Sequence, residues 1–123
     1  MLSEKEKPGL WGEIFAARYM REHGYEIITA NYRCRMGEID IIAQKDGFLV
    51  FTEVKTRSCG SIAKGREAVD FRKQERIVKT AAVFIQNNPY DLQPRFDVAE
   101  VTLGKNNEAL GCEYIENAFD SSF

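Results

Sequence analysis

The fold is decided by residues 38–55, which read EIDIIAQKDGFLVFTEVK. Two runs rich in Ile, Val and Phe flank Asp46-Gly47, a dipeptide typical of a two-residue turn between antiparallel strands. The stretch therefore predicts a β-hairpin with strands at 38–43 and 48–55. Because both runs are apolar on both faces, we expect these strands at the centre of a sheet, where an uncompensated charge is costly.

The turn also sets the register of the hairpin. A two-residue turn makes paired positions sum to 93, which places Asp40 opposite Glu53 and Glu38 opposite Lys55. These four side chains then share one face, because side chains alternate along a strand. Like charges on facing strands destabilise a sheet, so Asp40 and Glu53 need a compensating cation. A hard divalent ion such as Mg²⁺ is the natural one, since it binds carboxylate, phosphate and water oxygens.

Two further residues belong to this hypothesis. Lys55 points to the same side as Glu53 and could polarise a water or a phosphoryl oxygen beside a metal ion. Glu13 lies in the apolar arc of an N-terminal helix, where an unpaired charge is rare, so it is a candidate third carboxylate that leans toward the pair. The alternative is that these charges form the ordinary solvated face of an antiparallel sheet and that Glu13 reaches water.

The rest of the chain alternates between helical and strand patterns. A helix is predicted between Pro8 and Gly24, followed by strands at 25–28, 38–43 and 48–55. Residues 31–35 are polar and are expected to begin the strand at 38–43. A helix at about 66–86 and strands at 96–101 and 112–115 complete the predicted elements. The order α-β-β-β-α-β-β is that of an α/β or α+β protein. A length of 123 residues suits one domain, with frayed ends at 1–7 and 120–123.

Composition excludes several classes of protein. No apolar run approaches the ~20 residues that cross a bilayer, and the N-terminal residues lack the apolar segment of a secretory signal. Three cysteines and a single histidine provide neither a zinc cluster nor a disulfide framework. We therefore expect a cytoplasmic protein that does not associate with membranes.

Charge is nearly balanced, with 17 basic and 19 acidic residues. This balance argues against constitutive, non-specific binding of nucleic acid. The middle of the chain differs, because residues 61–95 carry seven basic and four acidic side chains. A polyanion would meet this segment first, unless the charges are simply the solvated face of a helix.

Short motifs of one known kind extend along nearly the whole chain. They are Gly12-Glu13, Ala16-Ala17, Tyr19, Gly24-Tyr25, Asn31, Arg33, Gly37-Glu38-Ile39-Asp40, Phe51, Glu53-Val54-Lys55, Arg57, Ala68-Val69, Lys73, Ile77, Ala81-Ala82, Arg95-Phe96-Asp97-Val98 and Asn117-Ala118-Phe119. Together they resemble the small bacterial YraN-like family, which is similar to the PD-(D/E)XK nucleases and to archaeal Holliday-junction resolvases. The resemblance implies one restriction-endonuclease-like α/β domain over residues 1–123, with a central mixed sheet of about five strands flanked by helices.

The resemblance also assigns a catalytic site that uses Mg²⁺ or Mn²⁺. Asp40 and Glu53 match the two motif carboxylates and Lys55 the motif lysine, while Ile39 stands where the superfamily name has proline. Glu13 resembles the helix glutamate that completes the metal site.

Two more positions are carried over from related nucleases. Val54 would contribute only its backbone carbonyl to the metal. A Gln or Lys of the following helix approaches the substrate in those enzymes, and both Lys73 and Gln74 fit that description here.

We therefore predict a metal-dependent endonuclease that hydrolyses phosphodiester bonds of DNA rather than RNA and recognises branched or junction DNA. The residues expected to contact nucleic acid are Arg57, Lys64, Arg66, Lys73, Gln74 and Arg76. Symmetric cutting of two strands favours a homodimer. The alternative is a module of the same fold that binds nucleic acid or a protein without cutting.

Overall fold

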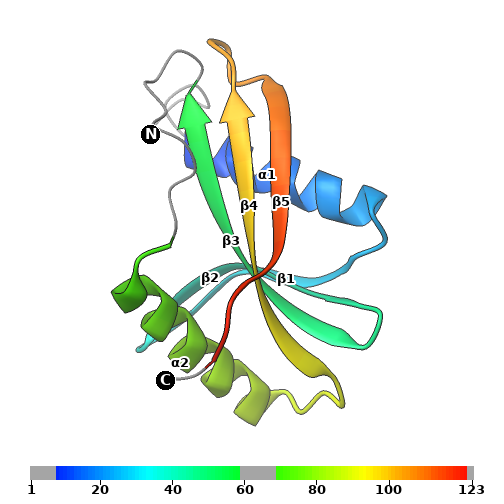
Figure 1. Ribbon diagram of the computed structural model, residues 1–123, viewed down its shortest axis with the longest axis vertical. Helices are drawn as coiled ribbons and strands as arrows, with labels where there is room; N and C mark the ends of the chain where they lie inside the picture. The colour runs from blue at the N-terminus through cyan, green and yellow to red at the C-terminus, as the bar shows by residue number, and fades with distance from the viewer. Residues whose placement is uncertain (1–7, 59–68, 122–123) are drawn as a thin grey trace.

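The computed structural model describes residues 8–58 and 69–121. These residues form a five-stranded mixed sheet with a helix on each face (Figure 1). The elements are α1 (Pro8–Glu22), β1 (Glu26–Cys34), β2 (Gly37–Lys45), β3 (Phe48–Ser58), α2 (Phe71–Asn87), β4 (Gln93–Leu103) and β5 (Ala109–Phe119). The strands lie in sequence order, and only β3 and β4 are parallel. The predicted α/β class, element order and five-stranded mixed sheet are confirmed.

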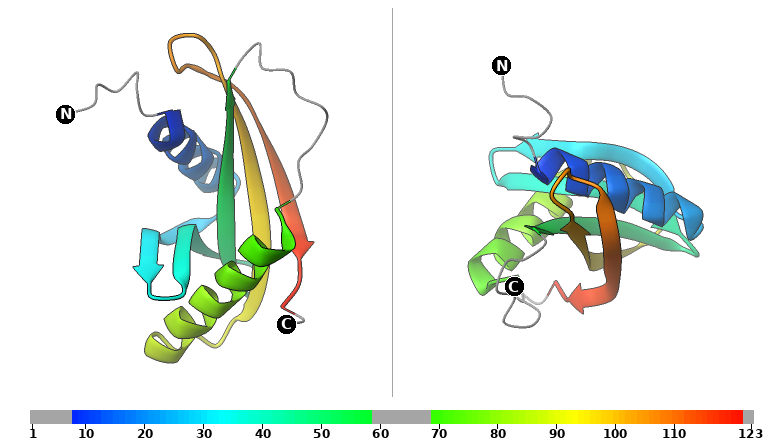
Figure 2. Two further views of the ribbon diagram at one scale, coloured as in Figure 1. Left: turned by 90° about the vertical axis from the view of Figure 1, so that its left-hand side faces the viewer. Right: turned by 90° about the horizontal axis from the view of Figure 1, so that it is seen from above.

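The β2–β3 hairpin has the predicted register. Lys45 pairs with Phe48 across Asp46 and Gly47, whose φ angles of 50° and 85° are those of the turn that suits a two-residue loop. The ladder continues only to the pair Ile41 and Thr52, so the predicted pairs of Asp40 with Glu53 and of Glu38 with Lys55 lie outside it. Beyond that pair β2 leaves β3, and the end of the β1–β2 hairpin turns out of the plane of β3, β4 and β5 (Figure 2, left).

Several element boundaries differ from the predicted ones. Residues 31–34 continue β1 instead of opening the next strand, because this polar segment pairs with β2 along its length. The second helix begins at Phe71 rather than near residue 66, since Asp70 caps it by accepting a hydrogen bond from the Lys73 amide at 2.9 Å. Strands β4 and β5 are longer than predicted, because pairing satisfies the backbone even where the side chains are polar.

The sheet separates two apolar cores. On β3, Leu49 and Phe51 face α2, whereas Val50 faces α1. The core under α2 also contains Ile39, Ile42, Val69, Ile77, Ala81, Phe84, Phe96 and Val98, and the core under α1 contains Ala16, Met20, Tyr25, Ile41, Ala43, Ala99, Val101 and Leu103. Neither helix of the described ranges is long and apolar enough to span a membrane.

Gly12 brings α1 unusually close to the sheet. A β-carbon at this buried position would collide with the Thr56 side chain on β3. The missing side chain therefore sets the distance between α1 and β3, and it also places the next residue, Glu13, over the sheet.

A buried carboxylate joins the inner strand β4 to the edge strand β5. Asp97 is fully buried and accepts four hydrogen bonds of 2.7–2.9 Å, two from the Arg95 guanidinium, one from the Tyr114 hydroxyl and one from the Asn117 amide. Asp97 is thus a structural acceptor for Arg95. Such complete satisfaction is what allows a charge to remain buried.

Replacing Gly12 by Ala tests the close approach of α1. The added methyl group must push α1 away from Thr56, so we expect the free energy of unfolding to fall by roughly 1–3 kcal/mol. Gly9→Ala is the matched control, because a β-carbon there meets nothing within 4 Å and alanine favours the helix. Urea denaturation of the three proteins measures both changes. Equal stability of the two variants would show that α1 does not depend on this contact.

Candidate functional site

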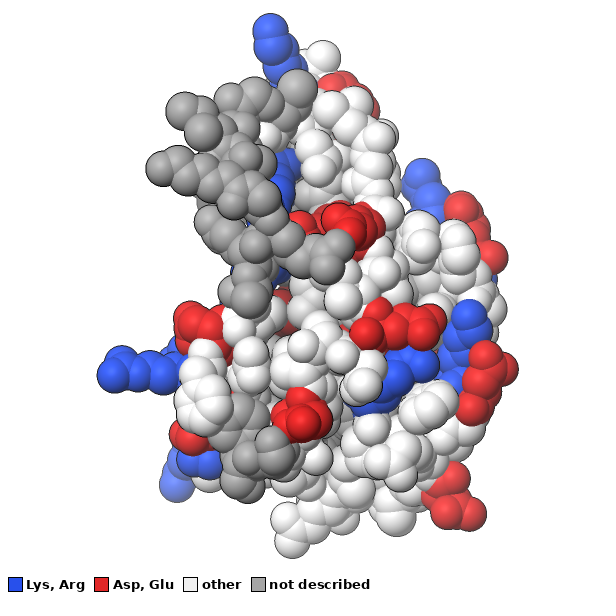
Figure 3. Space-filling view, viewed as in Figure 1, with Lys and Arg blue, Asp and Glu red and all other residues white. Residues whose placement is uncertain are grey.

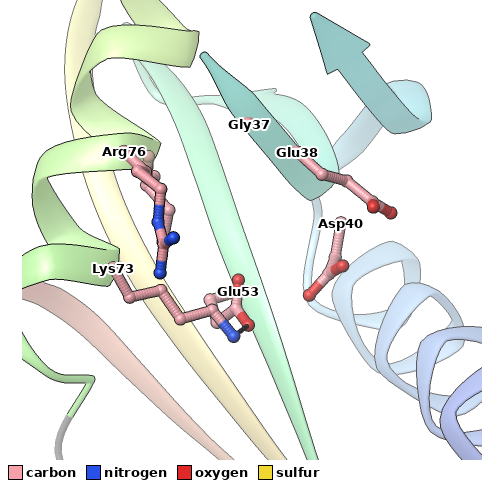
Figure 4. A pocket seen from close by; sticks show the side chains of 7 residues that line it. Gly37, Glu38, Asp40, Glu53, Lys73 and Arg76 are labelled. Carbon is pink, nitrogen blue, oxygen red and sulfur yellow. Dashed lines mark ion pairs between the residues drawn. The ribbon is translucent and has the colours of Figure 1, made fainter. Parts of the chain in front are cut away.

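A pocket of about 310 Å³ opens where β2 leaves β3 and α2 crosses the gap (Figure 4). Its lining comes from three elements and consists of Gly37, Glu38, Asp40, Glu53, Lys73, Arg76 and Ile77. The sheet side supplies the three carboxylates, and α2 supplies both cations. The predicted carboxylate pair and two of the predicted phosphate-contacting residues therefore share one cavity.

The Asp40 side chain accepts a backbone hydrogen bond where the β2–β3 ladder ends. Its Oδ2 accepts from the Val54 amide at 2.8 Å, just beyond the last pair of the β2–β3 ladder. Burial, together with the negative charge of Glu53, raises the pKa of Asp40 to about 7, and the hydrogen bond from the Val54 amide offsets only part of this rise. The predicted juxtaposition of Asp40 and Glu53 is thus present in the folded chain, with Asp40 half-buried and Glu53 buried.

Glu53 is the most enclosed carboxylate of the pocket, with a side chain only 7% exposed. Its Oε1 lies 2.6 Å from the Nζ of Lys73, which reaches down from the first turn of α2 (Figure 4). Burial lowers the pKa of the Lys73 ammonium, but the hydrogen bond and charge of Glu53 outweigh that effect, so the pKa is raised. The lysine therefore stays charged and balances Glu53.

Glu13 leans toward the same site from α1. Burial raises the pKa of Glu13, and the nearby charges of Glu38 and Glu53 add to this rise, while a hydrogen bond to the Asn31 side chain opposes it. Asn31 adopts a φ of 54° in the middle of β1, a left-handed conformation that asparagine tolerates better than most residues. Asn31 on β1 thus holds Glu13 of α1 on the side where the other carboxylates lie.

Glu38 is a pocket residue that the sequence-based hypothesis did not include. The hypothesis placed it opposite Lys55, but β2 has left β3 at this point, and Glu38 instead pairs with Arg33 on β1. Its Oε2 lies 3.1 Å from the Arg33 Nε. The spacing Glu38-x-Asp40 was the available signal, because it places both carboxylates at the same bend of one strand.

The structure distinguishes between the two candidates on α2. Gln74 directs its side-chain amide to the Val69 carbonyl at 2.7 Å, which closes the beginning of the helix. Lys73 instead extends into the pocket, and Arg76 stands one turn further along the same face. Lys73 is therefore the one that reaches the carboxylates.

Other predicted residues lie outside the pocket or outside the described ranges. Lys55 is half-buried on β3, on the same strand face as Glu53, and its register partner on β4 is Glu100. Arg57 is mostly buried, with its Nη2 3.5 Å from Glu100, so in this conformation its charge is directed inward rather than toward a phosphate. Lys64 and Arg66 belong to residues 59–68, which are not described.

The charged groups fit a cation only in part. Within residues 8–58 and 69–121, no three His, Cys, Asp or Glu side chains converge closely enough to hold a metal ion between them. Asp40 and Glu53 nevertheless provide hard oxygen donors beside each other, with more negative than positive charge around them. On the face shown in Figure 3, acidic and basic side chains are intermixed, so it presents no broad surface of one sign.

The fold and pocket define an α/β protein with a carboxylate-lined site between a sheet and a helix. The profile of the uncharacterised protein family UPF0102 matches residues 12–101, which include every lining residue of this site. The chain belongs to the UPF0102 family. This confirms the relationship to YraN-like proteins that the motifs predicted.

Relatives of high identity cover almost the full length of the chain. A UPF0102 protein of Caldanaerobacter subterraneus subsp. tengcongensis is 45% identical over 119 residues, which is 94% of this chain and 96% of the relative. A UPF0102 protein of Clostridium botulinum strain Loch Maree is 44% identical over 113 residues, or 90% of this chain and 92% of the relative.

The raised pKa of Asp40 predicts how stability depends on pH. The folded state keeps a proton that the unfolded chain releases near the ordinary pKa of 3.8, so the free energy of unfolding falls as pH rises from about 4 to about 7. Asp40→Asn removes this loss. In chelator at pH 8 we expect the variant to melt at or above the parent, where a gain of about 1 kcal/mol corresponds to roughly 4 °C. The advantage should shrink at pH 5.

Thermal melts at the two pH values measure this difference. Asp91→Asn is the control, because Asp91 is an exposed aspartate outside the pocket. A less stable Asp40→Asn protein at pH 8 would mean that the charge of Asp40 holds the structure together rather than straining it.

Proposed function

We propose that the pocket is the active site of a divalent-metal-dependent nuclease that hydrolyses phosphodiester bonds of DNA. One observation carries the proposal: the half-buried carboxylate of Asp40 and the buried carboxylate of Glu53 lie beside each other and face the cations Lys73 and Arg76 across a cavity. A phosphodiester needs both halves of this arrangement, since its anionic oxygens require cations and its hydrolysis is assisted by a metal ion.

The donor set suits Mg²⁺ or Mn²⁺. Asp40 and Glu53 would hold the ion, and the Val54 carbonyl, water and a phosphate oxygen would complete its oxygen ligands, as is usual for Mg²⁺. Glu13 would assist from α1 through the surrounding negative charge. A bound ion supplies Lewis-acid activation of a water and of the scissile phosphate.

The basic residues have separate roles in this proposal. Lys55, on the same face of β3 as Glu53, orients the attacking water or stabilises the charge that develops on the phosphoryl group. Arg76 contacts a non-bridging phosphate oxygen at the mouth of the pocket, where its planar guanidinium can form two hydrogen bonds.

The substrate class follows from the size of the protein. A domain of 123 residues leaves little surface for reading bases beside the cavity, so recognition by DNA shape, at branches or junctions, is favoured over sequence recognition. A homodimer would supply two such sites for symmetric cutting of two strands. On this proposal the fold is a restriction-endonuclease-like variant of the observed α/β sheet.

A second candidate function rests on the ion pair between Lys73 and Glu53. Because Lys73 already balances one carboxylate at 2.6 Å, the same pocket could serve a module that binds nucleic acid without a metal and without cutting. The two functions differ in whether a bound metal ion leads to cleavage of DNA, so cleavage assays with and without metal separate them.

Cleavage assays test the catalytic proposal directly. We expect the parent protein to cut branched, flapped or linear DNA with Mn²⁺ and to be inactive in chelator. Lys55→Ala should slow cleavage by roughly 10²–10³-fold while the fold is retained, because it removes stabilisation of the transition state. Lys79→Ala is the control, since Lys79 pairs with Glu75 outside the pocket. Unaltered cleavage by Lys55→Ala would exclude a catalytic role for that lysine.

Binding without cleavage tests the phosphate contacts. In chelator, affinity for DNA should fall as salt increases, because bound phosphates release counterions. Arg76→Ala should weaken binding to all sequences about equally and lower the slope of log Kd against log salt by roughly one. Fluorescence anisotropy with branched DNA and duplex RNA measures the slopes. An unchanged slope for Arg76→Ala would remove Arg76 from the interface.

A further inference from the structure

Lys73 occupies the carboxylate at which a metal ion would bind. Its Nζ lies 2.6 Å from Glu53 Oε1, and the Glu53 side chain is only 7% exposed. A divalent ion would approach a carboxylate oxygen to about 2.1 Å. The ammonium and the ion would therefore compete for one buried negative charge and would repel each other at this distance.

Two other polar side chains of α2 have partners outside the pocket. Gln74 is hydrogen-bonded to the Val69 carbonyl, and Lys79 is paired with Glu75. Arg76 lines the cavity, yet within the described ranges it forms no ion pair. In that part of the chain, the lysine in the first turn is the cation of α2 that reaches the carboxylates.

The side chain of Lys73 can move away from Glu53. It is 45% exposed, although its ammonium is bound to a buried partner. Lysine has a flexible four-carbon stem, so the ammonium can swing from Glu53 to the mouth of the cavity without movement of α2. Asp70, which caps the helix through the Lys73 amide, keeps the backbone in place during that change.

We infer that Lys73 is a built-in counter-cation that exchanges with the divalent ion. In the metal-free protein it neutralises the buried Glu53, which would otherwise face the half-buried Asp40 uncompensated. When the ion binds, the ammonium is released to the mouth of the cavity, where it becomes available to a phosphate. Metal and an anionic substrate then favour each other's binding, because each stabilises the released position of one lysine. The inference rests on the proposed metal site and adds its regulation.

Calorimetric titration with Mn²⁺ tests the exchange. Lys73→Met removes the competitor, so we expect its Kd for Mn²⁺ to be at least tenfold lower than that of the parent. Arg76→Met removes the same charge from the same wall without removing a carboxylate contact, and its Kd should change less than threefold. Lys79→Met, on the outside of α2, should match the parent.

A measurement on the parent protein avoids any effect of the substitutions on folding. The NMR signal of the Lys73 ammonium, assigned by its loss in Lys73→Gln, should show a protected, hydrogen-bonded group in chelator and a solvent-exposed group with saturating Mg²⁺. An unchanged signal under saturating Mg²⁺ would overturn the exchange.

The outcomes separate the inference from the proposed function. If the parent binds Mn²⁺ and Lys73→Met binds it no more tightly than Arg76→Met does, the exchange is wrong and the metal site stands. If neither the parent nor Lys73→Met binds Mn²⁺ at millimolar concentration, the metal site and the exchange both fail.

Discussion

The hydrogen bond from the Val54 amide to the Asp40 carboxylate connects the fold of this protein to its pocket. It forms where the β2–β3 ladder ends, and a side-chain oxygen there accepts the backbone hydrogen bond. Because the Asp40 carboxylate accepts this hydrogen bond in place of a backbone carbonyl, β2 can turn away from β3 while the Val54 amide keeps a hydrogen-bond partner. The gap that results is the cavity, and Asp40 is held at its edge beside Glu53. The geometry of the site is therefore a consequence of how one hairpin ends.

The chain treats its buried carboxylates in two different ways. Asp97 accepts four hydrogen bonds from Arg95, Tyr114 and Asn117, so its charge is fully satisfied inside the sheet. Asp40 accepts one amide hydrogen bond, and burial together with the negative charge of Glu53 raises its pKa to about 7. A structural carboxylate needs the first environment. The second is typical of sites where a charge is held for function, and it sets Asp40 apart within the same sheet.

The two sides of the pocket divide the charge between two elements. Carboxylates come from the sheet, where the hairpin register positions them, and cations come from α2, which Asp70 caps and Ile77 anchors in the core. The ion pair of Lys73 and Glu53 bridges the two sides. Glu53 is buried and Lys73 is half-exposed, and the cost of removing the buried charge from water offsets much of the attraction, so the pair contributes little net stability. Its role here is to place a cation from α2 against the buried charge of Glu53.

The sequence by itself determined the element order, the two-residue turn and the hairpin register as far as Ile41 and Thr52, since turn chemistry and strand alternation are local properties. It thereby brought Asp40 and Glu53 to the same place, although they lie just beyond the last pair of the ladder. It also placed Glu13 on the correct side of its helix. Only the tertiary structure showed that β2 leaves β3 beyond Ile41, and this departure brings Glu38 into the pocket and away from Lys55. It likewise decided that Lys73 rather than Gln74 reaches Glu53. These outcomes depend on how a strand end and a helix pack across the sheet, and contacts between segments distant in sequence leave no periodic pattern in the chain.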